Sequence, residues 1–195
     1  MIKYIIFDWG EVCTHGHLLR DFSFNLSKQT NTDKEKLEKI FRELEYPYET
    51  GKISPNQFWK EFKSRTELEI SVSEIQKIFL DSYSINNEML NYLLELKKKY
   101  KLVLFSNNYE DLFTHIKKVY KLDKYFDYTF SSSDIKFKKP EKKSYKHVLG
   151  KIKAKPNEVL FVDNKEKNII VAKQLGLKTI MFKDINQLKE ILEKV

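Results

Sequence analysis

The sequence predicts an α/β protein in which a parallel sheet is covered by helices on both faces. From residue 86 onward, short apolar runs rich in β-branched and aromatic residues alternate with helical patterns, which is typical of a parallel sheet. Between residues 15 and 86, four helical patterns follow one another without a strand between them. Several of the apolar runs also end in polar residues, as strands do beside a ligand site. We therefore expect a helical bundle inserted directly after the first strand.

The first strand is expected at residues 3–7 (KYIIF), which are mostly β-branched or aromatic and are followed at once by Asp8. The first helix of the insertion follows near residue 18. The second is predicted to open with a capping box formed by Thr32 and Glu35, and to end at Tyr46-Pro47-Tyr48. The third and fourth are predicted to open with the capping boxes Ser54/Gln57, with Pro55 at the first helical position, and Ser71/Glu74.

The second half of the chain is predicted to alternate helix and strand. The expected strands are residues 101–105, 128–131, 159–162 and 179–182. The expected helices are residues 87–99, 109–119, 141–150 and 166–175, followed by a terminal helix. Gly176 is expected to end the helix before it, since glycine adopts the left-handed conformation that a helix terminus requires.

The composition is that of a globular protein with one core and room for a small inserted unit. Hydrophobic residues make up 41% and charged residues 33% of the 195 residues. No apolar run approaches the length of a membrane span, and the N-terminal segment has no signal-peptide pattern, so we expect a cytoplasmic protein without a membrane partner. Cys13 is the only cysteine, which excludes an intrachain disulfide and a thiolate metal site.

The net charge of +8 raises the question of nucleic-acid binding. The lysines are spread along the chain at helix-surface spacings and are interleaved with glutamates, so nucleic acid is not the expected partner. The densest lysine cluster, at residues 136–143, is better explained by attraction of a small anionic substrate.

Three predicted strands end in polar groups, which are Asp8, the Ser106-Asn107 pair and the Asp163-Asn164 pair. In a parallel sheet these tips meet at one edge, where they would form one crevice. Lys139 is the candidate cation for this crevice. Pro140 is expected to open the next helix at its first position and to keep the lysine before it extended. Taken alone, Lys139 could instead be a solvated lysine at a helix start.

These motifs resemble those of the haloacid dehalogenase superfamily of phosphohydrolases, and the resemblance covers the whole chain. The family's four motifs are matched in order by Asp8-Trp9-Gly10, by LVLF-Ser106-Asn107, by Lys139-Pro140 and by FV-Asp163-Asn164. The resemblance implies a Rossmann-like three-layer core formed by residues 1–14 and 87–195. It also implies an all-helical cap domain formed by residues 15–86, similar to the cap of sugar-phosphate phosphatases.

The resemblance also implies a mechanism. Asp8 would attack phosphorus and form an aspartyl-phosphate, which water then hydrolyses. Mg²⁺ would be held by Asp8, the carbonyl of Gly10, Asp163 and Asn164. Catalysis is assigned to Asp8, Ser106 and Lys139, with Lys139 holding the transferring phosphoryl group. The residues expected to bind substrate are Gly10, Glu11, Asn107, Asn108 and Lys139.

Two residues depart from the family pattern. Gly10 stands where phosphatases carry the aspartate that protonates the leaving oxygen, and loss of a general acid typically slows a reaction by about 10²- to 10⁴-fold. Asn164 stands where a carboxylate usually reaches the metal, so weaker Mg²⁺ binding is expected. We therefore expect slow turnover of a small phosphorylated metabolite, with sugar phosphates as candidates. The oligomeric state is not predicted.

Two alternatives remain at the level of sequence. One is a catalytically weak or silent member of the family that binds a phosphorylated metabolite or a protein partner. The other is a metal-independent 2-haloacid dehalogenase, which is similar in the spacing of Lys139 and Tyr145. Against it, Asp163 beside Asp8 would repel a carboxylate substrate.

The helical insertion is expected to choose the substrate. Its candidate side chains are Arg20, Tyr46, Tyr48 and Trp59, since aromatic rings stack on sugars and arginine pairs with anions. For Trp59, packing inside the bundle is the simpler interpretation. His15 and His17 lie where the insertion begins, and either could reach the site.

Overall fold

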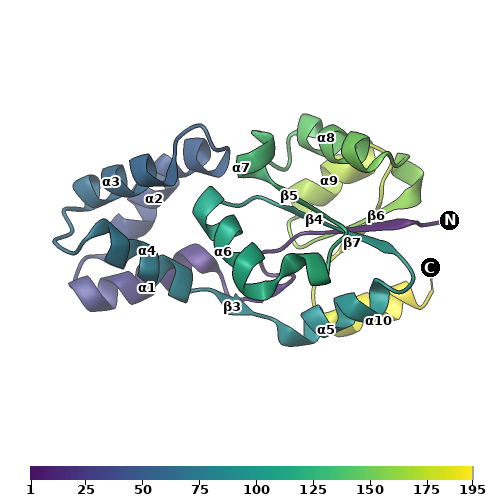
Figure 1. Ribbon diagram of the computed structural model, residues 1–195, viewed down its shortest axis with the longest axis horizontal. Coiled ribbons are helices and arrows are strands. Elements are labelled where there is room, and N and C mark those ends of the chain that lie inside the picture. Colours follow the sequence, from purple (N-terminus) through teal and green to yellow (C-terminus); the bar gives the residue numbers. More distant parts are fainter. Residues whose placement is uncertain (195) are drawn as a thin grey trace.

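A five-stranded parallel sheet forms the centre of the computed structural model, which describes residues 1–194 (Figure 1). The strand order is β5-β4-β1-β6-β7. The strands are β1 (Tyr4–Phe7), β4 (Lys101–Ser106), β5 (Tyr128–Ser131), β6 (Val159–Asp163) and β7 (Lys178–Met181). Phe7 is level with Leu104 of β4 and with Val162 of β6, so the carboxyl ends of these three strands lie side by side.

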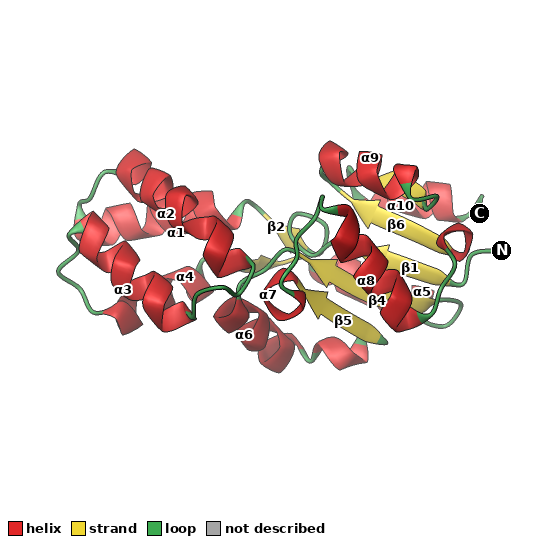
Figure 2. Ribbon diagram, turned by 90° about the horizontal axis from the view of Figure 1, so that it is seen from above, coloured by secondary structure: helices red, strands yellow, loops and turns green. Residues whose placement is uncertain are grey.

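Helices cover both faces of the sheet, which confirms the predicted three-layer α/β fold (Figure 2). They are α5 (Asn87–Leu96), α6 (Glu110–Tyr120), α7 (Ser132–Ile135), α8 (Lys142–Ile152), α9 (Glu166–Gln174) and α10 (Ile185–Leu192), with short 3₁₀ turns at Leu122–Lys124 and Pro156–Glu158. Because side chains alternate along a strand, Ile6 packs on the α8 and α9 side, whereas Ile5 and Phe7 pack on the side of α5 and α10.

The inserted segment forms a four-helix bundle beyond the carboxyl end of the sheet (Figure 1). Its helices are α1 (Leu18–Thr30), α2 (Lys34–Glu49), α3 (Pro55–Thr66) and α4 (Val72–Asp81). Aromatic side chains fill its interior, among them Phe22 and Phe79, whose ring centroids lie 5.2 Å apart at 89°. Such edge-to-face pairs stabilise a core beyond the area they bury. We name α1–α4 the cap helices.

A short antiparallel ribbon of β2 (Thr14–His15) and β3 (Ser84–Ile85) joins the cap helices to the sheet. Sequence analysis did not predict these two-residue strands, which are too short to show an alternating pattern. The ribbon lies close to the boundaries expected between core and cap. The division into domains at residues 1–14 with 87–195 and 15–86 stays a prediction.

The capping boxes at Ser54 and Ser71 are confirmed, but the predicted ends of α2 are wrong. Asp33, not Thr32, is the N-cap, and its carboxylate accepts from the backbone N–H of Lys36 at 2.6 Å. Pro47 lies inside the helix, because the loss of one hydrogen bond in the last turn is tolerated where the next residues, including Tyr48, are buried.

The predicted position of Pro140 is also wrong. Helix α8 begins at Lys142 with Glu141 as its N-cap, so Pro140 lies before the helix and not at its first position. The backbone carbonyl of Glu141 starts the helix instead, since it accepts from the backbone N–H of Ser144 at 2.9 Å. The other predicted elements agree with the structure within one to three residues at each end. No helix within residues 1–194 has the length and apolar character needed to cross a membrane.

Candidate active site

Three strand tips bring Asp8, Ser106 and Asp163 to the same edge of the sheet. The three side chains are buried, and Asp8 is the most exposed of them at 5%. The backbone N–H of Asp8 donates to the carbonyl of Val162 at 2.9 Å, which extends the pairing of β1 and β6 by one residue. The convergence follows from the order β4-β1-β6, which places these strands next to one another.

Lys139 joins the two carboxylates. Its Nζ atom lies 2.8 Å from Asp8 Oδ1, 2.8 Å from Asp163 Oδ2 and 2.8 Å from the carbonyl oxygen of Phe105. The residue is 1% exposed, so the solvated-lysine alternative is wrong. A buried ammonium group is tolerated here because two carboxylates and a carbonyl replace its hydration.

The buried charges shift the proton affinities of the groups in this cluster. Burial raises the pKa of the Asp8 carboxyl group; Lys139 opposes this shift and Asp163 adds to it. Burial lowers the pKa of Lys139, but the attraction of Asp163 and Asp8 outweighs this effect, so its pKa lies above the ordinary value. Lys139 is therefore a charged ammonium group at neutral pH.

Asp163 is held by four hydrogen bonds from three donor groups. Besides Lys139, the Asn168 amide donates to both carboxylate oxygens at 3.0 and 2.9 Å, and the backbone N–H of Lys165 donates to Oδ1 at 2.8 Å. Sequence analysis missed Asn168 as a partner, although its position five residues after Asp163, on the first turn of α9, is a usable signal. Asp163 is thereby fixed in one orientation.

Asn107 positions the Lys139 loop. Its Oδ1 accepts from the Lys139 backbone N–H at 2.8 Å, and its Nδ2 donates to the Lys139 carbonyl at 2.9 Å. The Ser106 hydroxyl donates to the Asn107 carbonyl at 3.3 Å. This hydrogen bond is long, so the hydroxyl could donate to a better acceptor instead. The Asn108 side chain accepts from the backbone N–H of Tyr109 at 2.8 Å. Asn107 and Asn108 are thus already engaged with the protein.

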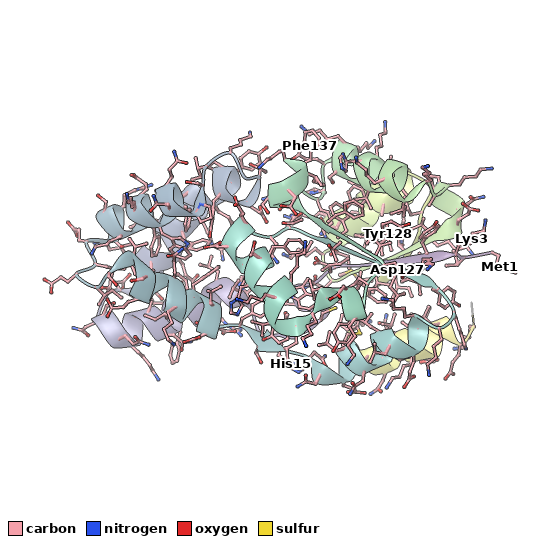
Figure 3. The ribbon with its side chains drawn as sticks, in the orientation of Figure 1. Met1, Lys3, His15, Asp127, Tyr128 and Phe137 are labelled. Atoms are coloured by element: carbon pink, nitrogen blue, oxygen red, sulfur yellow. The ribbon has the colours of Figure 1, made fainter. Side chains whose placement is uncertain are left out.

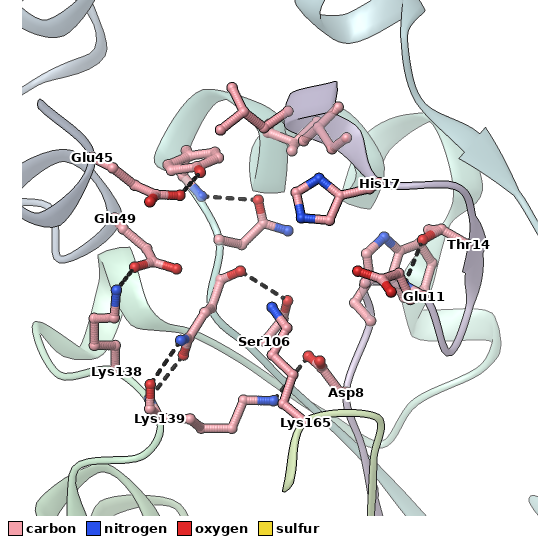
Figure 4. Close-up of a pocket in the computed structure, with 18 of the residues that line it drawn as sticks. Asp8, Glu11, Thr14, His17, Glu45, Glu49, Ser106, Lys138, Lys139 and Lys165 are labelled. Carbon is pink, nitrogen blue, oxygen red and sulfur yellow. Dashed lines mark hydrogen bonds and ion pairs between the residues drawn. The ribbon is translucent and has the colours of Figure 1, made fainter. Parts of the chain in front are cut away.

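A cavity of about 240 Å³ lies above these groups (Figure 4). Its lining includes the predicted residues Gly10 and Glu11. The backbone N–H of Glu11 donates to Thr14 Oγ1 at 2.9 Å, and Glu11 adopts a left-handed conformation with a φ of 60°. The tight turn this produces carries the chain from β1 toward the cap helices, and Gly10 lies exposed in the cavity lining.

The cap helices close the cavity with polar side chains from one face of α2. These are Arg42, Glu45 and Glu49, which are three and four residues apart and so share a face. Tyr109 donates to Glu45 Oε1 at 2.6 Å, and Lys138 forms an ion pair with Glu49 (Figure 4). Sequence analysis missed this face, although the polar spacing within an amphipathic helix was visible.

The cap residues expected to contact substrate do not line the cavity. Tyr48 and Trp59 are buried and donate to Asp111 of α6, with a Trp59 Nε1 to Asp111 Oδ2 distance of 2.8 Å. Tyr46 and Arg20 are exposed at the surface.

Of the two histidines at the start of the insertion, only His17 lines the cavity. His15 is exposed on the ribbon (Figure 3). Its imidazole therefore does not belong to the candidate site.

A parallel sheet with a carboxylate at the tip of its first strand, covered by a helical bundle, defines a Rossmann-like α/β protein with a cap and a candidate nucleophile at the sheet edge. The chain belongs to the haloacid dehalogenase-like hydrolase family, whose profile matches residues 2–176. It is similar to D-ribitol-5-phosphate phosphatase from Bacteroides thetaiotaomicron, with 28% identity over 193 residues that cover 92% of this chain and 91% of that protein.

Solved structures agree with this assignment. A haloacid dehalogenase (HAD) family enzyme from Bacteroides thetaiotaomicron, in complex with magnesium and inorganic phosphate, has a TM-score of 0.85 and 26% identity, covering 96% of this chain and 99% of that one. An L-2-haloacid dehalogenase from Xanthobacter autotrophicus has a TM-score of 0.67 at 19% identity, covering 100% of this chain and 83% of that one, which shows a shared fold alone.

A third relative is much longer than this chain. Bifunctional epoxide hydrolase 2 from Rattus norvegicus is 35% identical over 132 residues, which are 64% of this chain. The match spans 24% of that relative's length. The chain therefore corresponds to about a quarter of this relative.

Proposed function

We propose that this chain is a phosphohydrolase that acts on a small phosphorylated metabolite through Asp8. The observation that carries the proposal is the buried Asp8–Lys139–Asp163 cluster, of which Asp8 and Lys139 line a cavity beneath the cap helices. The family assignment and the similarity to a sugar-alcohol phosphatase support the same reaction. A polyol phosphate is accordingly the substrate class to test first.

In the proposed reaction, Asp8 is the nucleophile. Lys139 holds Oδ1, which leaves Oδ2 to attack phosphorus. The new bond joins Oδ2 to phosphorus, and the bond from phosphorus to the leaving alcohol oxygen breaks. Water then attacks the aspartyl-phosphate, which releases phosphate and restores the carboxylate. Ser106 Oγ would turn from the Asn107 carbonyl to donate to a phosphoryl oxygen.

The oxygen atoms at the strand tips are of the kind that can hold a magnesium ion. Asn164 Oδ1 is buried and has no hydrogen-bond partner among residues 1–194, which leaves this amide oxygen free to act as a ligand. With Asp8, the Gly10 carbonyl and Asp163 it would provide oxygen donors of the kind that Mg²⁺ prefers. When bound, the ion would offset the repulsion between a phosphate group and the attacking carboxylate.

The site lacks a carboxylic acid at position 10, so the leaving oxygen would depart without a proton from that residue. The proposed enzyme is therefore slow on esters of ordinary alcohols and faster where the leaving group is good.

The dehalogenase alternative is less well supported. The Tyr145 hydroxyl donates to the Asn168 carbonyl at 3.0 Å, and Tyr145 is buried at 1% exposure outside the cavity lining. The tyrosine that matches the dehalogenase spacing therefore lies outside the cavity above Asp8. A binding protein without turnover remains the second candidate, because Gly10 and Asn164 both remove a carboxylate.

The test is a panel of phosphate monoesters with Mg²⁺ that includes pentitol 5-phosphates and sugar 1- and 6-phosphates. An Asp8→Asn variant is the control. We expect hydrolysis by the wild type alone, and a phosphorylated Asp8 peptide by mass spectrometry after rapid quenching. Ester binding without either signal would identify a binding protein, and halide release from 2-haloacids would identify a dehalogenase.

A further inference from the structure

The Lys139 ammonium group is shared among three protein oxygens. Its Nζ atom donates to Asp163 Oδ2 and to the Phe105 carbonyl and forms an ion pair with Asp8 Oδ1, each at 2.8 Å. An ammonium group has three donors and no more. Two of them are used in hydrogen bonds to the protein, so Lys139 has at most one donor for a phosphate oxygen.

A second lysine reaches the same floor. Lys165 lies in the loop between β6 and α9, where its backbone N–H is bound to Asp163 Oδ1. Its side chain lines the cavity and extends toward Ser106 (Figure 4). Lys138 and Lys139 are both paired with carboxylates, whereas Lys165 takes part in no ion pair within the described residues 1–194. Its ammonium group is available to a ligand.

Lys165 borders the space between the sheet and the cap helices. The cavity that it lines is also lined by Asp8 at the sheet edge and by Glu49 of α2. A phosphate group that reaches Asp8 would therefore enter the same cavity as the Lys165 side chain.

We propose that Lys165 is a second cation that contacts the phosphate group of the ligand, beside Lys139, which also holds Asp8 and Asp163 in position. This inference rests on the proposed phosphohydrolase function. The strand tips of the site provide two carboxylates, Asp8 and Asp163, since positions 10 and 164 are Gly10 and Asn164. The two lysines balance these two charges before a ligand arrives. An unpaired ammonium group then forms a strong, charge-assisted hydrogen bond with a phosphate oxygen.

The test is calorimetric titration with inorganic phosphate, with and without Mg²⁺. The proteins are the wild type, Lys165→Met, the conservative Lys165→Arg and the control Lys173→Met, whose lysine is exposed on the outer part of α9. We expect the phosphate Kd of Lys165→Met to rise by about tenfold in both conditions, as for loss of a hydrogen bond to a charged group. Lys165→Arg should restore much of the affinity, and the thermal midpoint of all four proteins should be the same.

The outcomes separate this inference from the function on which it rests. If the wild type binds phosphate and Lys165→Met binds it equally well, Lys165 is not the phosphate contact, although the phosphohydrolase proposal stands. If Lys173→Met weakens binding as much as Lys165→Met, the effect is one of general charge and the inference is also overturned. A wild type that neither binds phosphate nor hydrolyses an ester contradicts the proposed function itself.

Discussion

At the level of single residues, the candidate site depends on the Lys139 ammonium group. It is almost completely removed from water, and both carboxylates beside it are buried as well. Two buried carboxylates without a cation between them repel each other and lose their hydration. The cluster is therefore stable only as a set, and the effect of removing one member exceeds that of losing a surface ion pair.

Replacing Lys139 by methionine should destabilise the protein. Removing one partner of a buried charge cluster typically costs about 3–5 kcal/mol, so we expect the free energy of unfolding to fall by that amount. Urea denaturation followed by circular dichroism measures it. Lys142→Met, at an exposed lysine three residues later, is the matched control and should change stability by less than about 0.5 kcal/mol. Equal stability of both variants would contradict the assigned role of Lys139.

A carboxylic acid at position 10 should accelerate turnover. A Cβ atom built on Gly10 meets no atom within 4 Å, so a side chain there has room. General acids contribute about 10²- to 10⁴-fold, and we expect kcat of Gly10→Asp on a polyol phosphate to rise by at least about tenfold. Gly10→Asn has the same shape without the acid and should show no gain. A similar rise in both variants would mean that the gain does not come from proton transfer.

A second carboxylate at position 164 should tighten magnesium binding. Asn164 Oδ1 is buried without a partner among residues 1–194, and a carboxylate there adds a charged ligand at the same place. We expect Asn164→Asp to lower the Mg²⁺ Kd by about three- to tenfold, measured by calorimetry in the absence of substrate. Asn107→Asp is not expected to do so, since the Asn107 side chain is bound to the Lys139 backbone.

At the scale of elements, α6 connects the sheet to the bundle (Figure 1). Its Asp111 accepts from Tyr48 of α2, from Trp59 of α3 at 2.8 Å and from Gln76 of α4 at 3.4 Å. One carboxylate thereby joins three of the four cap helices to the core. This arrangement fixes α2, whose Glu45 and Glu49 close the cavity, relative to Asp8 below it.

Removing the Asp111 carboxylate should loosen the cap helices. Asp111→Ala leaves the buried Tyr48 hydroxyl and Trp59 indole N–H without their acceptor, and each unsatisfied donor costs about 1–3 kcal/mol. We expect a loss of at least about 2 kcal/mol in the free energy of unfolding, together with a red shift of Trp59 emission. Glu110→Ala, at the exposed neighbouring position on α6, is the control. An unchanged emission spectrum would mean that Asp111 does not hold the bundle.

At the scale of the whole molecule, core and cap share one hydrophobic cluster. It contains Phe22 and Phe41 of the cap helices as well as Leu90 and Leu112 of the core helices. Two units that bury their apolar surface in one continuous cluster lose it together. The bundle is therefore expected to unfold with the sheet and not before it.

The two tryptophans allow this cooperativity to be measured. Trp9 lies beside the sheet and Trp59 lies in the bundle. In Trp59→Phe and Trp9→Phe, a single tryptophan reports on one region. We expect the fluorescence midpoint in urea to coincide with the circular dichroism midpoint in each variant. An earlier fluorescence transition in Trp9→Phe, where only the cap is observed, would show that the cap unfolds independently.

The sequence by itself determined the alternation of strands and helices, the parallel sheet, the helical insertion and the residues at the strand tips. Hydrophobic periodicity, capping residues and apolar runs are local properties of the sequence, so they can be recognised without the structure. The carboxyl ends of parallel strands also meet at one edge of the sheet whatever the details of packing. Asp8, Ser106 and Asp163 could therefore be named in advance, and so could Lys139 as the cation of the crevice.

Only the tertiary structure decided which partners these groups have. The contacts of Lys139 with Asp8, Asp163 and Phe105 join segments that are distant in the chain, and so do the contacts of Asp111 with the cap helices. The Asn168 bonds to Asp163 and the unpaired position of Lys165 in the cavity likewise depend on packing. Sequence patterns report which residue types lie on a helix or strand, whereas the direction of a long side chain is set by neighbours that are distant in the chain.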